Sequence, residues 1–83
     1  MIQKYQKKPT IIEAIQYTEE TLQTILLWIA HHNAKAEYKN DKLMIHTLEG
    51  THEATLNDFI IKGIHNEFYP CKPTIFNKLH DKI

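Results

Sequence analysis

The pattern of apolar and polar residues predicts a strand, a helix and then several short strands. Residues 9–18, PTIIEAIQYT, are rich in β-branched and aromatic residues, which favours a strand. Apolar side chains fall on both faces of this strand, so we expect it in the middle of a sheet. Its polar residues Glu13 and Gln16 would then lie in a partly buried setting.

The next segment has the periodicity of an amphipathic helix. We expect Thr18 to cap it, Glu19 and Glu20 to lie in its first turn, and Asn33 to end it in a left-handed conformation. The apolar stripe recurs at helical spacing and consists of Leu22, Ile25, Leu26 and Ile29.

Pairs of turn-forming residues divide the rest of the chain into short strands. These pairs are Asn40–Asp41, Glu49–Gly50, Asn57–Asp58 and His65–Asn66. Residues 67–70, EFYP, form a short extended stretch, because the residue before a proline disfavours helical geometry.

The last residues, 73–83, carry apolar side chains at helical spacing, and a final strand is the alternative. This order of elements predicts one α+β domain over residues 1–83. We expect a mainly antiparallel sheet of about four to five strands, with one main helix on one face and a short C-terminal helix.

Composition narrows the possible partners. Ten lysines balance ten acidic residues, and the chain has no arginine, so binding of duplex DNA is not expected. A chain of 83 residues buries about 60–65% of its unfolded surface, which favours a homodimer or higher homo-oligomer. A single cysteine, Cys71, and the lack of a long apolar run indicate a cytoplasmic protein without a membrane partner.

Candidate catalytic chemistry is sparse. The chain has no serine and no glycine-rich phosphate loop, and one cysteine cannot build a structural zinc site. Among six histidines, His46 and His52 are expected to face each other across a hairpin, with Glu53 nearby. We nevertheless expect no metal, no cofactor and no enzymatic activity.

Two long segments carry a family pattern: KYQKKPTIIEAIQY at 4–17 and NDFIIKGIHNEFYPCKPTIF at 57–76. The chain resembles small phage and prophage proteins that read like KYRKKPVVVEAxQW near one end and GDYIIKGVxGEFYPCKPDIF near the other. Gln6 replaces a usual arginine and Tyr17 a usual tryptophan. Asn57 and Asn66 stand at glycine positions, and asparagine tolerates the positive φ that such turns require.

The resemblance implies a phage protein that counters bacterial immunity in the host cytoplasm. It would sequester a nucleotide-derived signal, of the cyclic nucleotide or ADP-ribose type, without cleaving it. The alternatives are direct binding to a host defence protein, through a surface near Leu27 and Trp28 or through the EFYPCKP loop, and a structural or accessory role in the phage.

The candidate ligand-binding residues come from both ends of the chain, which we expect to meet at one concave site. They comprise three lysines for phosphate, three aromatic residues for stacking and three polar residues for orientation: Lys7, Lys8 and Lys72; Tyr17, Phe68 and Tyr69; Glu13, Gln16 and Glu67. The structural alternative is that the aromatic rings of EFYPCKP fill the core while its prolines set the chain direction.

Overall fold

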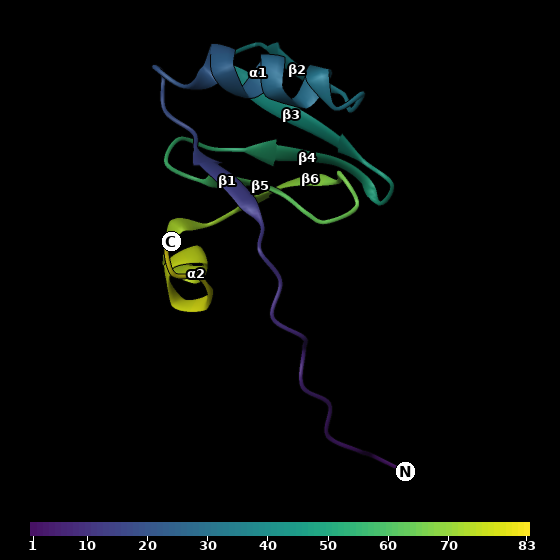
Figure 1. The fold of residues 1–83 in the computed structure, drawn as a ribbon. Helices are drawn as coiled ribbons and strands as arrows, with labels where there is room; N and C mark the ends of the chain where they lie inside the picture. Colours follow the sequence, from purple (N-terminus) through teal and green to yellow (C-terminus); the bar gives the residue numbers. More distant parts are fainter.

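The computed structural model describes residues 1–83 and contains six strands and two helices (Figure 1). In chain order these are β1 (Glu13–Gln16), α1 (Leu22–His31), β2 (Ala36–Lys39), β3 (Lys42–Thr47), β4 (Gly50–Ala54), β5 (Phe59–Lys62), β6 (Phe68–Cys71) and α2 (Pro73–Leu79). The mixed α+β class expected from the sequence is confirmed.

The strands form two antiparallel sheets of three strands each, ordered β1-β5-β6 and β2-β3-β4. The expectation of one sheet with four to five strands is therefore wrong in detail. After β4, the next strand, β5, pairs with β1 and not with β4. Two hydrogen bonds at the start of β5 secure this pairing: Tyr17 N–H donates to Asp58 O at 2.7 Å, and Asn57 N–H donates to Tyr17 O at 2.7 Å. This pairing starts a second sheet.

The position of β1 also differs from the expectation. β1 is an edge strand that pairs only with β5, and β5 holds the central place. Glu13 and Gln16 are exposed, which corrects the partly buried setting expected for them. Ile60 and Ile61 of β5 are both buried, so the strand with two apolar faces is β5.

One hydrophobic core lies between α1 and the two sheets. Helix α1 contributes its inward-facing residues Ile25 and Ile29, and each sheet contributes apolar side chains of its own. The other buried members are Tyr17, Leu43, Ile45, Ala54, Ile60 and Phe68. The core is small, with 11 of 83 residues buried, as expected for a chain of this length.

Helix α1 begins later than the sequence suggested. Its N-cap is Thr21, while Thr18 lies one turn earlier and exchanges hydrogen bonds with it: Thr18 N–H donates to Thr21 Oγ1 at 2.8 Å, and Thr21 N–H donates to Thr18 Oγ1 at 3.2 Å. Glu19 and Glu20 therefore precede the helix, and its first turn contains no acid.

Asparagine and aspartate residues define the turns, as the sequence predicts. Asn33 follows α1 with φ of 61°, and Asn40 and Asp41 join β2 to β3 with φ of 54° and 61°. Asn57 and Asn66 have φ of 77° and 61°. These residue types enter the left-handed region at lower cost than most others, so the turns form without glycine.

The predicted C-terminal helix is confirmed and begins at Pro73, which needs no N–H donor in the first turn. Its Phe76 ring stacks on Phe59 of β5 at 4.0 Å with an interplanar angle of 5°. His80 stacks on the other side of Phe76 at 4.6 Å. This aromatic stack attaches α2 to the sheet.

Candidate functional site

Most of the EFYPCKP segment is built into the fold. The Phe68 side chain is 2% exposed and packs edge-to-face against Trp28, with ring centroids 5.1 Å apart. Pro70 pairs with Ile60 on the outer strand of its sheet, where a proline that lacks an N–H is tolerated. The structural alternative therefore describes Phe68 and the prolines, and the Phe68 ring is not open to stack on a base.

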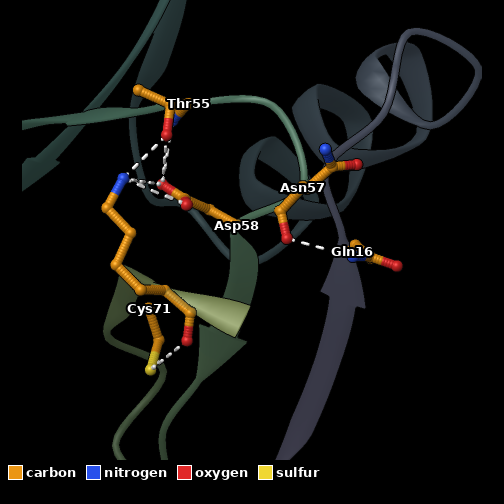
Figure 2. Close-up of polar contacts among 6 residues, drawn as sticks. Gln16, Thr55, Asn57, Asp58 and Cys71 are labelled. Atoms are coloured by element: carbon orange, nitrogen blue, oxygen red, sulfur yellow. Dashed lines mark hydrogen bonds and ion pairs between the residues drawn. The ribbon is translucent and has the colours of Figure 1, made fainter. Parts of the chain in front are cut away.

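Lys72 is largely exposed, but its ammonium group is bound in a polar cluster. Its ammonium group donates to Thr55 Oγ1 at 2.7 Å and lies 3.2 Å from Asp58 Oδ1. Asp58 is 3% exposed, and its Oδ2 also accepts from Thr55 N–H at 2.9 Å and from the Thr55 hydroxyl at 3.1 Å. Figure 2 shows Thr55 and Asp58 turned toward each other at the turn before β5. The lysine expected to neutralise phosphate already has a carboxylate partner.

Cys71 lies beside this cluster and is half-buried. Burial raises the pKa of its thiol, and the charge of Asp58 raises that pKa further. The thiolate is therefore scarcer at neutral pH than in a free thiol, which disfavours a nucleophilic role.

The candidate residues of the first strand do not gather in a pocket. Glu13 Oε1 lies 3.3 Å from Lys62 Nζ. The Gln16 amide donates to Asn57 O at 3.0 Å, and Figure 2 draws this second contact. Tyr17 is 5% exposed in the core, and burial raises the pKa of its phenol. The Tyr17 ring is consequently closed to a stacking ligand.

Lys7 and Lys8 belong to an N-terminal segment, residues 1–12, that has no helix or strand and makes no backbone hydrogen bond. Figure 1 shows this segment running away from the body of the protein before it enters β1. Both lysines are exposed. The two chain ends, expected to form one concave site, are not brought together within a single chain.

A different concave site lies where the β3–β4 hairpin meets the β5–β6 hairpin. We call it the hairpin cleft; it has a volume of about 370 Å³, and its lining residues are Thr47, Leu48, Glu49, His52, His65, Glu67, Phe68 and Tyr69. Three of these, Glu67, Phe68 and Tyr69, were candidates from the sequence. The other five were not, although Glu49 and His65 stand in predicted turns.

The local fold fixes the position of Glu67, one of the two acids that line this cleft. Gly63 N–H donates to Glu67 O at 2.8 Å, and the Glu67 carboxylate lies where a Cβ on residue 63 would have to be. Glu67 Oε2 accepts from His65 N–H at 2.9 Å. A glycine at position 63 therefore lets the carboxylate fold back over the β5–β6 turn.

The polar side chains that line the hairpin cleft are two carboxylates, one phenol, two imidazoles and one threonine hydroxyl. Tyr69 is 39% exposed; burial raises the pKa of its phenol, and the charge of Glu67 raises it further. The phenol is thus a neutral O–H donor at physiological pH. Two carboxylates, Glu49 and Glu67, line the cleft and no lysine does. The site is suited to an amino group or a base edge that donates hydrogen bonds, and unsuited to phosphate.

The histidines are spread over different surfaces. His46 pairs with Thr51 across the β3–β4 hairpin, whereas His52 pairs with Ile45, so the two imidazoles lie on opposite faces of the sheet. The expectation that they face each other is wrong. His46 Nε2 instead lies 3.1 Å from Glu37 Oε1. No group of three or more His, Cys, Asp or Glu side chains is arranged to hold a metal ion.

Comparisons with protein-family models, curated proteins and solved structures find no match to this chain. The resemblance of its two end segments to small phage proteins therefore rests on the sequence patterns alone. Neither helix of the structure has the length and apolar character needed to cross a membrane.

Proposed function

We propose that the protein is a non-enzymatic phage protein that sequesters a small nucleotide-derived immune signal of its host. The observation that carries the proposal is the hairpin cleft, which presents the half-exposed Tyr69 beside the Glu67 carboxylate. Its volume of about 370 Å³ falls within the range of about 300–1,000 Å³ typical of small-molecule sites.

In this proposal, the base or the ribose of the ligand binds in the hairpin cleft, because the side chains there suit those groups. The partly exposed Tyr69 ring is the stacking group of the cleft, and the Glu67 and Glu49 carboxylates accept hydrogen bonds from amino groups or hydroxyls. Phosphate groups would be repelled by these carboxylates, so they point away from the cleft into solvent. This revises the roles of Lys7, Lys8 and Lys72, none of which lines the cleft.

The test is a thermal-shift panel of cyclic dinucleotides, cyclic trinucleotides and ADP-ribose derivatives. A ligand at a hundredfold its dissociation constant stabilises the folded chain by about 2.7 kcal/mol, which raises the melting temperature. Recovery of the intact nucleotide after heat denaturation distinguishes sequestration from cleavage. A panel in which no member shifts the melting temperature contradicts the proposal.

A matched pair of variants assigns binding to the cleft. Tyr69→Ala removes the stacking ring and is expected to weaken binding by about 5- to 150-fold, the equivalent of about 1–3 kcal/mol. The control is Tyr38→Ala, because Tyr38 is a tyrosine of similar exposure, 44% against 39%, and lies on β2 away from the cleft. Equal effects of the two substitutions would place the ligand elsewhere.

A second candidate function is direct inhibition of a host defence protein, which the exposure of Leu27 favours. This leucine is 62% exposed on α1, next to the half-buried Trp28. The candidate predicts that one host protein is captured stoichiometrically and that Leu27→Asp abolishes capture. Leu56→Asp, at a leucine 52% exposed in the turn before β5, serves as the control.

A further inference from the structure

The outer edge of β1 and the segment that precedes it are both left without a backbone partner. β1 pairs with β5 on one side only, and residues 1–12 make no backbone hydrogen bond. Yet Thr10, Ile11 and Ile12 are β-branched strand formers that continue the sequence pattern of β1. The strand stops short at Glu13 because its partner β5 ends at Lys62, opposite that residue.

The direction of each backbone group in β1 follows from one hydrogen-bonded pair. Both the N–H and the C=O of Tyr17 bond toward the β5 side. Because these groups alternate along an antiparallel strand, Glu13 and Ile15 also point toward β5, and Ile12, Ala14 and Gln16 point outward. The Gln16 carbonyl confirms this alternation, since it accepts from Thr21 Oγ1 at 2.7 Å on the outer side.

A groove runs beside this edge and supplies room for apolar side chains. It has a volume of about 320 Å³ and is lined by Glu13, Ala14, Ile15, Thr24 and Trp28. Ile11 shares the face of Ile15 and Tyr17 when the strand is continued, and it is 76% exposed in the isolated chain. The groove of one copy therefore offers space for an apolar side chain, and the exposed Ile11 of another copy is such a side chain.

We propose that two copies of the chain pair antiparallel through the outer edges of residues 10–16, with Ala14 of each copy at the twofold axis. The sheet β1-β5-β6 then continues into its mate as a six-stranded sheet. Pairing buries Ile11 of each copy beside the partner's core face and supplies backbone partners for Ile12 and Ala14. The dimer requires no ligand and is independent of the proposed function.

The choice of register rests on backbone direction and charge. Outward-pointing residues must pair with each other, which permits a centre at any residue from 12 to 16. A centre at Glu13 opposes two carboxylates, which is unfavourable. A centre at Ala14 places the smallest side chain at the axis and carries the basic stretch Lys7–Lys8 of one copy toward Glu19–Glu20 of the other. Because the net charge of the chain is zero, the two copies carry no overall repulsion.

A second copy fits this edge better than any other free edge of the molecule. β6 contacts both β3 and β4, and it carries Pro70, which has no N–H to donate to a partner strand. β2 carries the charged residues Glu37 and Lys39 and turns back at once through Asn40 and Asp41, with no unpaired strand to extend it. Only β1 combines an open edge with an unpaired continuation of its own.

Charge substitutions at the axis test the proposal by sedimentation velocity. The wild-type chain is expected to sediment with twice the mass of one chain, and Ala14→Lys and Ala14→Glu are each expected to sediment as monomers, because like charges meet at the axis. An equimolar mixture of the two variants is expected to recover the dimer. Tyr38→Lys, on the edge of the other sheet, is the control and leaves the dimer intact.

A monomeric wild type overturns the proposal, and so does a dimer that persists in both Ala14 variants. Amide hydrogen exchange on the wild type provides a readout that needs no variant. The amides of Ile12 and Ala14 are expected to be protected at concentrations where the dimer forms and to exchange freely on dilution. Free exchange at both concentrations also overturns the pairing.

Discussion

The two ends of the chain have the same kind of unusual composition and opposite structural situations. The C-terminal EFYPCKP segment lies in a strand and at a helix start, with Phe68 in the core and Lys72 bound to Asp58. The N-terminal KYQKKP segment is exposed along its length and makes no backbone hydrogen bond. Rare residues in the first segment are explained by contacts within the chain, whereas those in the second are exposed and have no such explanation.

This contrast shows how a rigid motif and a binding motif can look alike in a sequence. Prolines, aromatic rings and a lysine suit a recognition loop, and they equally suit a strand that enters a core and then starts a helix. Burial distinguishes the two cases residue by residue. In EFYPCKP, only Glu67 and Tyr69 of the proposed ligand contacts face an open cleft.

Of the substitutions that test this contrast, one at Phe68 is expected to have the largest effect on the free energy of unfolding. Phe68→Ala removes a side chain that packs against Trp28 and His32, and it is expected to lower the free energy of unfolding by about 3–5 kcal/mol in a urea titration. Tyr69→Ala, one residue along the same strand but 39% exposed, is the control and should cost about 1 kcal/mol or less. Equal losses would show that the segment is not divided into a core side and a cleft side.

A smaller effect is expected at the polar cluster that secures Lys72. Asp58→Ala leaves the Thr55 N–H and the Lys72 ammonium without their carboxylate, and the free energy of unfolding should fall by about 2 kcal/mol. Most of this cost comes from the Thr55 N–H and hydroxyl, which lose their bonds to Asp58 Oδ2, because Lys72 itself is largely open to solvent.

The matched control for Asp58 is another acid in an ion pair, Glu37, which lies on the surface beside His46. Glu37→Ala should change the free energy of unfolding by less than about 0.5 kcal/mol, since exposed pairs contribute little. If Asp58→Ala is equally mild, Lys72 is not held by the fold and becomes available again as a ligand contact.

Local features of the fold could be predicted from the sequence because single residues determine them. Asn33, Asn40 and Asn66 all adopt the positive φ expected of asparagine at turns, and Pro73 begins the C-terminal helix. The pairing of strands could not be predicted, because it depends on which open edge β5 meets. The apolar patterns of β1 and β5 are similar, and neither names its partner; the pairing appears only in the structure, where β1 pairs with β5 and Tyr17 bonds to the turn before β5.

The same difference between local features and spatial contacts explains why the sequence predicted only some residues of the candidate site. Glu67 and Tyr69 were identified from their own chemistry, whereas Glu49 and His52 join them only because the two hairpins meet in space. A turn residue carries no sequence signal of which other turn it will approach. The alternation of faces along the strand could not predict the burial of Tyr17 either, because Glu13 lies on the same face and is exposed.

The smallest effect on the free energy of unfolding is expected at the N-terminal segment. Removal of residues 2–8 deletes Lys7 and Lys8 without breaking any backbone hydrogen bond within the chain. At a concentration where sedimentation shows monomers, the truncation should change the free energy of unfolding by less than about 0.5 kcal/mol, because exposed segments without contacts contribute little. A larger loss would mean that the segment folds back on its own chain, and the contrast between the two ends would fail. The truncation could instead leave the monomer's free energy of unfolding unchanged and weaken the dimer at higher concentration. The segment would then act between copies, where Lys7 and Lys8 approach Glu19 and Glu20 of the other copy.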